Sequence, residues 1–168
     1  VDAKTGAFKW KYPADPEPFD TVVSVSPAVE NGLVYFGAGN GRLYAIGTDK
    51  GQIRWIFDTR SSISAAPTVV NGVVYFCTSD GKVWALDSMT GAQLSAWKTT
   101  TFKAVDEIRG APAVGNGMVY VISQDQALHA LGLTTGKLRG TVRLGGMVRG
   151  QSPVVDGEYV FAAAGRNL

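Results

Sequence analysis

Residues 45–55 read Ala-Ile-Gly-Thr-Asp-Lys-Gly-Gln-Ile-Arg-Trp, and versions of this stretch recur at residues 1–10 and 85–97. In each copy a glycine is followed by a tryptophan, four residues later in the first two copies and six later in the third. A fourth copy has a glycine at the tryptophan position, Gly140. We predict a tight turn that needs positive φ at its glycine, followed by a strand that carries the tryptophan.

Other features recur in register with this stretch. A small residue followed by proline occurs four times, and the prolines are 40, 45 and 41 residues apart. An Asn-Gly or Asp-Gly pair follows each proline, and these pairs favour the type I′ turn of a β-hairpin. The positions are Pro27, Pro67, Pro112 and Pro153 for the prolines, and 31–32, 71–72, 116–117 and 156–157 for the turn pairs.

These repeats predict an all-β fold, a β-propeller built of four-stranded antiparallel blades with about four copies of the repeat. No segment shows a sustained helical period. A single small sheet cannot bury both faces, whereas sheets stacked around an axis can; a linear solenoid is the alternative. Residues 1–168 are expected to form one domain or segment, with units near 1–12 (the last strand of a preceding or closing blade), 22–58, 65–99, 110–143 and 151–168 (incomplete).

The stretch Ala85-Leu86-Asp87-Ser88-Met89-Thr90-Gly91 resembles the Ala-x-Asp-x-x-Thr-Gly-x-x-x-Trp motif of the PQQ-like, or quinoprotein-type, propeller repeat family. In that family these residues are structural. The aspartate can accept hydrogen bonds from its own turn, and the tryptophan can dock against the next blade. The resemblance implies blade-docking roles for Asp2, Asp87, Gly6, Gly51, Gly91, Gly136, Trp10, Trp55 and Trp97.

The resemblance leaves the function open, because a fold does not determine an activity. Some members of the family are quinone-dependent dehydrogenases. Others, such as the propeller lipoprotein of the barrel-assembly machinery and the sensor domains of some kinases, bind no quinone. The calcium ligands, catalytic aspartate and adjacent cysteines of the quinone enzymes cannot be matched to residues here.

We therefore predict a non-catalytic scaffold that binds a protein or another ligand, with no catalytic, cofactor or metal residues and no cofactor. One alternative is a segment of a PQQ-dependent oxidoreductase, which would use PQQ and calcium. Another is a small-molecule sensor domain.

Two residue types that often carry chemistry occur once each. His129 occupies the strand position that Tyr44 and Trp84 hold in the sister repeats, which favours a packing role. A site with several histidine ligands is excluded. Cys77 follows an apolar strand segment, which favours a buried, inert thiol.

The segments between successive units are the candidate binding loops. In a propeller they lie on one face at the mouth of the axial channel, and loops on a rigid scaffold often carry binding residues. The alternative is that they are ordinary solvated connectors. The candidates for contact with a protein or peptide partner are Asp15, Glu17, Phe19, Asp20, Arg60, Phe102, Asp106, Glu107, Arg109 and Arg149.

Charge and hydrophobicity restrict the possible binding partners and membrane associations of the chain. A net charge of +2 without a basic run predicts no nucleic-acid binding. The apolar stretches are too short for a transmembrane helix. The resemblance implies a periplasmic or extracellular location in a bacterium. The two ends of the chain have complementary parts of the repeat, so a closed four-bladed ring, self-association that completes a ring, and a piece of a larger propeller all fit.

Overall fold

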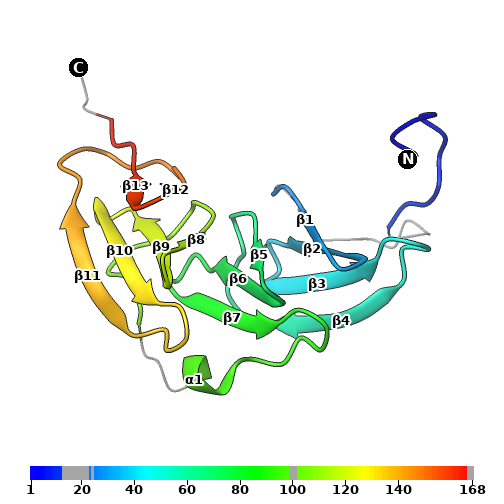
Figure 1. Ribbon diagram of the computed structural model, residues 1–168, viewed down its shortest axis with the longest axis horizontal. Coiled ribbons are helices and arrows are strands. Elements are labelled where there is room, and N and C mark those ends of the chain that lie inside the picture. Colours follow the sequence, from blue (N-terminus) through cyan, green and yellow to red (C-terminus); the bar gives the residue numbers. More distant parts are fainter. Residues whose placement is uncertain (13–22, 24, 99–101, 166–168) are drawn as a thin grey trace.

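The computed structural model describes residues 1–12, 23, 25–98 and 102–165. Within these residues the structure is all-β apart from one short helix, α1 (Ser95–Lys98). Antiparallel sheets follow one another along an open arc, as Figure 1 shows. The predicted fold class, a propeller of antiparallel blades, is confirmed. None of the described segments forms a helix long and apolar enough to cross a membrane.

The sheets, which we call blades 1 to 4, follow the chain order and differ in strand number. Each sheet has its strands in simple meander order, so every connection inside a blade is a hairpin. Blade 1 contains β1 (Ala28–Glu30), β2 (Leu33–Gly37), β3 (Arg42–Gly47) and β4 (Ile53–Asp58); blade 2 contains β5 (Thr68–Val70), β6 (Val73–Cys77) and β7 (Val83–Asp87); blade 3 contains β8 (Ala113–Gly115), β9 (Met118–Ser123), β10 (Ala127–Gly132) and β11 (Leu138–Arg143); blade 4 contains β12 (Val154–Asp156) and β13 (Tyr159–Phe161).

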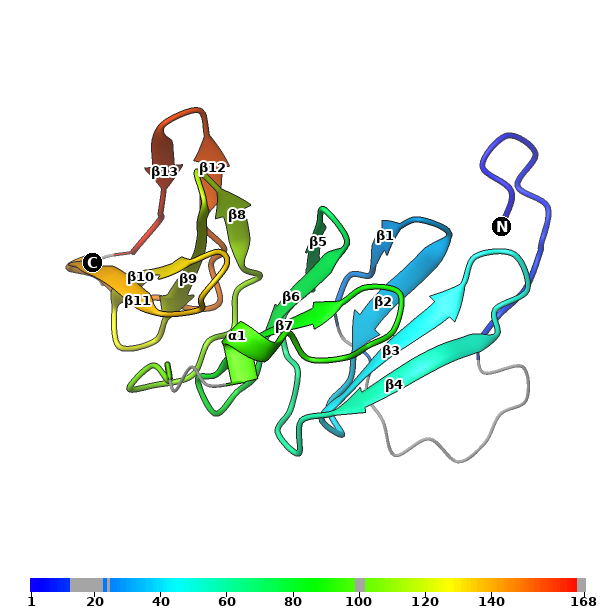
Figure 2. The same ribbon diagram turned by 60° about the horizontal axis from the view of Figure 1, so that its bottom comes forward.

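The first strand of each blade lies on the concave side of the arc, and these inner strands contact one another from blade to blade. Seen from the second direction, the blades stand side by side with their hairpin turns at the two ends (Figure 2). The first turn has the predicted conformation, with φ of 49° at Asn31 and 75° at Gly32. Because the strands of a blade are antiparallel and follow one another in order, its first and third turns lie at one end and its second turn lies at the other.

Blade 2 departs from the predicted four strands. After Gly91 the chain makes one isolated bridge, between Leu86 and Gln93, and then forms α1, so Trp97 lies on a helix and not on a fourth strand. The tryptophan comes two residues late in this copy. A strand would carry it about 6.6 Å too far, at about 3.3 Å per residue, whereas a helix rises only about 1.5 Å per residue.

The N-terminal residues also differ from the expected strand. Residues 1–12 form a turn but no strand, because no partner strand lies beside them among the described residues. They lie at the opposite end of the arc from β12 and β13 (Figure 1). The described chain is therefore an open arc and not a closed four-bladed ring.

The core lies between the blades. One apolar cluster, which includes Tyr35, Leu43 and Phe76, joins blades 1 and 2. A second, which includes Tyr75 and Val121, joins blades 2 and 3. Strands apolar on both faces are what such sandwiched sheets require, and burying these faces is the main stabilising contribution to the fold.

Candidate functional site

The tryptophans of the repeat make the same contact at successive blade junctions. The indole nitrogen donates to the carbonyl of the residue that begins the third turn of the next blade: Trp10 to Thr48 at 2.8 Å, Trp55 to Ser88 at 2.9 Å and Trp97 to Leu133 at 3.0 Å. Trp97 is 3% exposed, and Trp10 and Trp55 are half-buried.

Two of the turn glycines lie directly beneath these rings. A Cβ on Gly51 would lie 2.6 Å from the Trp10 ring, and a Cβ on Gly91 would lie 2.6 Å from the Trp55 ring. Gly91 also has φ of 70°, which side chains disfavour. Gly6 and Gly136 share the positive φ, at 70° and 64°.

The aspartate of the motif holds its own turn. Asp87 Oδ1 accepts from the amides of Met89 (3.1 Å) and Thr90 (2.8 Å) and from the Thr90 hydroxyl (2.7 Å). The hydrogen bonds from Thr90 lower the pKa of Asp87. Asp2 makes the same turn, and with the hydrogen bond from Lys9 as the largest cause its pKa falls to about 2.

The predicted binding loops that the structure describes lie at the end of the blades that carries the second turns. Backbone amides tie each of them to such a turn: Thr59 donates to Gly41, Ala104 to Gly81 and Leu144 to Gln126, at 2.9, 3.0 and 2.9 Å. We call the surface formed by residues 59–64, 102–109 and 144–151 the connector face. Its backbone is held to the scaffold by these bonds.

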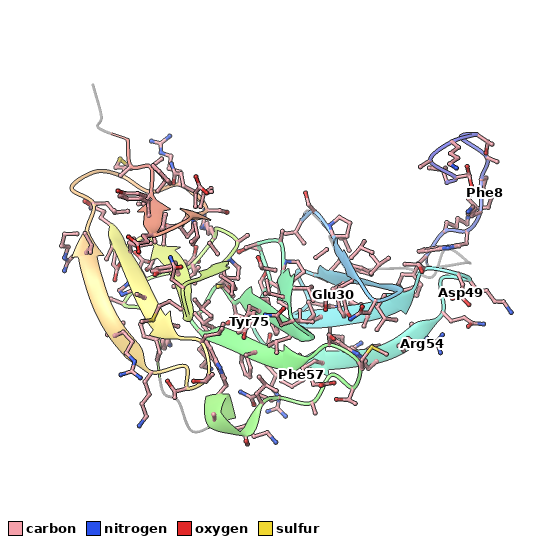
Figure 3. The ribbon with its side chains drawn as sticks, in the orientation of Figure 1. Phe8, Glu30, Asp49, Arg54, Phe57 and Tyr75 are labelled. Carbon is pink, nitrogen blue, oxygen red and sulfur yellow. The ribbon has the colours of Figure 1, made fainter. Side chains whose placement is uncertain are left out.

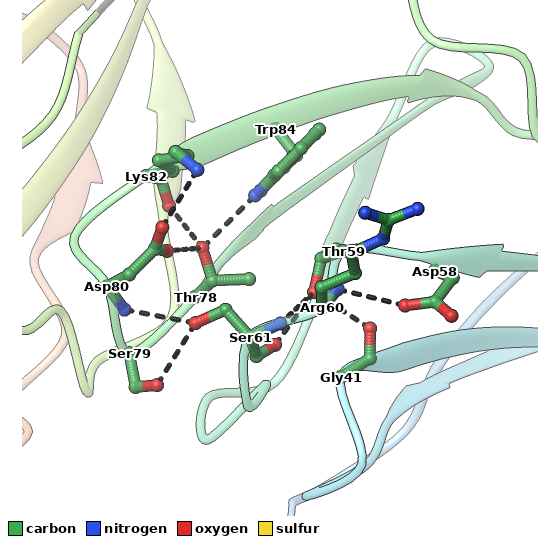
Figure 4. A network of polar contacts seen from close by, with 10 residues as sticks. All are labelled: Gly41, Asp58, Thr59, Arg60, Ser61, Thr78, Ser79, Asp80, Lys82 and Trp84. Atoms are coloured by element: carbon green, nitrogen blue, oxygen red, sulfur yellow. Dashed lines mark hydrogen bonds and ion pairs between the residues drawn. The ribbon is translucent and has the colours of Figure 1, made fainter.

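A polar network reinforces the connector face between blades 1 and 2 (Figure 4). The Thr78 hydroxyl donates to Asp80 Oδ1 (2.6 Å) and accepts from Trp84 Nε1 (3.1 Å), and Ser61 Oγ accepts from the Asp80 amide (3.2 Å). Asp80 Oδ2 lies 2.9 Å from Lys82 Nζ. Burial would raise the pKa of Asp80, but the contacts with Thr78 and Lys82 lower it, so the carboxylate is charged at neutral pH.

The three predicted arginines of the connector face are exposed. Arg60 has φ of 59°, and its amide donates to Asp58 Oδ1 at 2.9 Å. Arg109 Nε lies 2.6 Å from Glu107 Oε2. The Arg149 amide donates to the Gln151 side chain. Gly150 packs near the Arg109 backbone, so the connectors that carry Arg109 and Arg149 are neighbours.

Asp106, an acidic residue near Arg109, makes hydrogen bonds inside its own connector and with blade 3. Asp106 Oδ1 accepts from the Glu107 amide at 2.7 Å, and the Asp106 carbonyl accepts from Ser123 Oγ at 2.9 Å. The bond from Ser123 ties this connector to blade 3, and the Arg109 and Asp106 side chains are exposed.

Phe102, one of the predicted partner-binding residues, packs against the blades instead of lying on the surface. It is half-buried against the cluster between blades 2 and 3, and its ring centroid lies 5.2 Å from that of His129. His129 is 6% exposed, as its predicted packing role requires. Its Nδ1 lies 3.1 Å from the Thr141 hydroxyl and its Nε2 lies 3.4 Å from Asp125 Oδ2. Phe102 therefore anchors the connector that begins at residue 102.

Sequence reasoning missed Asp125 as the partner of His129, although a repeat signal points to it. A polar second-turn residue comes four positions before the aromatic strand residue in blades 1 to 3: Asn40 before Tyr44, Asp80 before Trp84 and Asp125 before His129. Asn40 Nδ2 donates to the Tyr44 hydroxyl at 3.3 Å. The second-turn residue thus contacts the aromatic residue directly in blades 1 and 3, whereas in blade 2 the Thr78 hydroxyl joins Asp80 to Trp84.

The remaining candidates offer no catalytic constellation in the described part of the chain. Asp15, Glu17, Phe19 and Asp20 lie outside the described residues. Cys77 is buried, which raises the pKa of its thiol. Over the described ranges, no three His, Cys, Asp or Glu side chains gather where they could hold a metal ion. This donor set does not fit the calcium site that a quinone enzyme would need.

Residues 1–167 match the model of the family described as outer membrane protein assembly factor BamB. The chain belongs to the BamB family. A search of curated proteins finds no match. The BamB-family assignment agrees with the PQQ-like repeat resemblance and with the blade geometry described above.

Solved structures share the propeller fold. BamB from Moraxella catarrhalis matches with a TM-score of 0.70 and 25% identity over 94% of this chain and 47% of that protein. The computationally designed Ika8 protein matches with a TM-score of 0.70 and 19% identity over 82% of this chain and 41% of the design. The quinohaemoprotein alcohol dehydrogenase ADHIIG of Pseudomonas putida HK5 matches with a TM-score of 0.60 and 25% identity over 71% of this chain and 20% of the enzyme. This BamB-family chain thus spans less than half the length of each of these three proteins.

Proposed function

We propose that this BamB-family chain is a non-catalytic propeller scaffold that binds a protein or peptide partner through its connector face, outside the bacterial cytoplasm. The observation that carries the proposal is the presentation of exposed arginines on connectors whose backbone is bonded to the blades. Preorganised side chains lose little conformational entropy when they bind. The name of the family, an assembly factor of the outer membrane, supports both the partner class and the location.

The chemistry of the connector face favours a partner with exposed carboxylates. Guanidinium groups bind carboxylates through paired hydrogen bonds. Arg60 and Arg149 make no ion pair within the described residues, and the exposed Arg109–Glu107 pair is weak enough to exchange for a new partner. An acidic, extended peptide segment is therefore the proposed ligand of the face.

The test compares two triple variants of the chain. Arg60→Ala, Arg109→Ala and Arg149→Ala together remove the connector-face cations. Lys50→Ala, Lys137→Ala and Arg139→Ala remove three exposed cations near the third turns, at the opposite end of the blades. Binding to bacterial envelope proteins and to a glutamate-rich peptide is measured at low salt and at about 0.15 M salt, where screening acts over about 8 Å.

We expect the connector-face variant to lose at least about tenfold in affinity for both probes and the control variant to bind as the parent does. Loss of secondary structure, checked by circular dichroism, identifies a folding defect. Equal binding by both folded variants would contradict the proposal.

A second candidate, a segment of a PQQ-dependent oxidoreductase, is favoured by the match to a quinohaemoprotein alcohol dehydrogenase. The poor fit of the described donors to a calcium site supports the scaffold instead. Titration with PQQ and calcium separates the two candidates. A shifted quinone absorption spectrum together with dye-linked alcohol oxidation would establish the enzyme and remove the scaffold proposal.

Self-association that completes the ring stays a prediction for this chain. Its measurement is the mass in solution by light scattering over a range of protein concentrations. Because the chain covers about half of BamB from Moraxella catarrhalis, the same measurement on any longer form of the protein is the matched control.

A further inference from the structure

The junction between blades 2 and 3 contains a pocket of about 420 Å³ that none of the contacts above fills. It lies between the turn of β5 and β6, the start of α1 and the turn between β10 and β11 of the next blade. These first and third turns lie at the end of the blades opposite the connector face. The pocket is therefore separate from the proposed partner-binding site. Its principal lining residues are Val73, Tyr75, Leu94, Ser95, Leu133 and Thr134.

The pocket accompanies the change from a strand to a helix in blade 2. Four residues after the turn glycine, blade 1 has Trp55 and blade 2 has Ser95. Trp97 still reaches the equivalent carbonyl from α1, and its ring centroid lies 5.8 Å from that of Tyr75, as Trp55 lies 5.8 Å from Tyr35. The helix thus supplies the indole from a different direction, and the small Ser95 lines the space beside it.

Tyr35 and Tyr75 hold equivalent positions in blades 1 and 2, but their hydroxyl groups make different contacts. The Tyr35 hydroxyl donates to the Ser88 carbonyl at 3.2 Å, the same carbonyl that Trp55 uses. Tyr75 is 3% exposed, lines the pocket and has no hydrogen-bond partner for its hydroxyl among the described residues. Figure 3 shows Tyr75 on blade 2, within the row of side chains between neighbouring sheets. Burial raises the pKa of Tyr75, so the phenol keeps its proton at neutral pH.

A ligand in the pocket can accept the hydrogen bond of the Tyr75 hydroxyl, which lines the pocket and has no partner among the described residues. The walls of the pocket are mostly apolar, through Val73, Leu94 and Leu133, and no charged side chain lines it. Such walls favour a flat, uncharged ring over an ion or a sugar. The volume lies within the range of small-molecule sites, about 300–1,000 Å³.

We propose that this pocket binds a small, neutral, planar aromatic molecule whose hydrogen-bond acceptor receives the Tyr75 hydroxyl. Leu94 and Leu133 would cover the two faces of the ring, and Ser95 would lie at the rim. The serine at the tryptophan position distinguishes this site from the pocket at the junction of blades 3 and 4, which the equivalent Tyr120 lines and where Gly140 holds that position.

The test uses two probes of the same shape. Quinoline has a ring nitrogen that accepts a hydrogen bond, and naphthalene has none. Amide resonances of the ¹⁵N-labelled chain are followed while each probe is added. We expect saturable shifts at Ser95, Leu133 and Thr134, with quinoline bound about three- to tenfold more tightly than naphthalene, as one net hydrogen bond provides.

Three variants make the test specific. Tyr75→Phe should remove the preference for quinoline and keep the naphthalene affinity. Tyr35→Phe, the same change at the first junction, should leave both affinities unchanged. Ser95→Trp restores the tryptophan of the repeat and should fill the pocket, so that neither probe binds.

The proposal is wrong if neither probe gives saturable shifts at millimolar concentration, or if the shifts lie away from these residues. It is equally wrong if Tyr75→Phe binds quinoline as the parent does. Tyr75→Phe keeps the ring and its packing, so the outcome remains interpretable if Ser95→Trp does not fold.

Discussion

The junction between blades 1 and 2 and the junction between blades 3 and 4 use the same positions of the repeat, yet only the first is filled. Trp55 spans the first junction, with its ring over Gly91 of the next turn. At the last junction Gly140 stands in its place, and a Cβ there would meet nothing within 4 Å. A pocket of about 560 Å³ lies over this part of β11, whose residues are all exposed.

The comparison distinguishes two contacts that join neighbouring blades, one between the inner strands and one made by the outer tryptophan. Blade 4 is still attached through the inner strands, where Gly115 packs so closely on the Val155 side chain that a Cβ would overlap it. The outer tryptophan is therefore not needed to place one blade beside the next. It adds buried apolar area and a hydrogen bond at the outer edge, so we expect stability to fall from the filled junctions toward blade 4.

The largest effect is expected at the most buried tryptophan. Trp97→Ala should lower the free energy of unfolding by about 3–5 kcal/mol, because it removes a buried indole and leaves a cavity. Trp55→Ala should cost less, because Trp55 is half-buried. Urea unfolding followed by tryptophan fluorescence and circular dichroism measures both. Equal midpoints for Trp97→Ala and the parent would show that the outer contact contributes nothing.

Gly91→Ala should have the next largest effect, about 2–4 kcal/mol. It combines the strain of a side chain at φ of 70° with overlap against the Trp55 ring. Gly117→Ala is the matched control, because Gly117 also has φ of 70° but has nothing within 4 Å of its Cβ position. It should cost about 1–2 kcal/mol. Similar losses in the two variants would mean that the Trp55 ring moves aside.

Asp87→Asn should cost about 1 kcal/mol at neutral pH, because it weakens the charge-assisted hydrogen bonds of the third turn. The folded pKa of Asp87 is lowered below 3.8, so its contribution is complete well above pH 3.8 and is lost as the pH falls through the folded pKa. The free energies of unfolding of parent and variant should therefore converge once the pH lies below the folded pKa of Asp87. A difference that persists unchanged at that pH would contradict the role of the charge.

The smallest effect is expected at the open junction. Gly140→Ala should raise the free energy of unfolding by about 0.5–1 kcal/mol, because alanine loses less backbone entropy in a strand and meets no neighbour here. The same substitution at Gly115 should destabilise through overlap with Val155. Destabilisation by Gly140→Ala would indicate that another segment packs over β11 in solution.

Local features of this protein were determined by its sequence alone. The Asn-Gly pairs, the Asp87 turn and the positive φ of the turn glycines involve groups only two to five residues apart, so the residue types suffice to predict them. Their recurrence predicts the blades, their order and the propeller family. The packing role of His129 follows in the same way, by comparison with its sister positions.

Other features were decided only by the tertiary structure, because they depend on distances between segments far apart in the chain. Trp97 lies on α1 because its acceptor, Leu133, is 36 residues away and must be met at one point in space. The Phe102 side chain lies inward because its ring packs against the ring of His129. The Tyr75 hydroxyl has no partner among the described residues, whereas the equivalent Tyr35 hydroxyl donates to Ser88 of the next blade, a contact that depends on where the neighbouring turn lies. Repeat periodicity assigns equivalent positions in the blades, but the contacts at each position depend on the neighbouring blade.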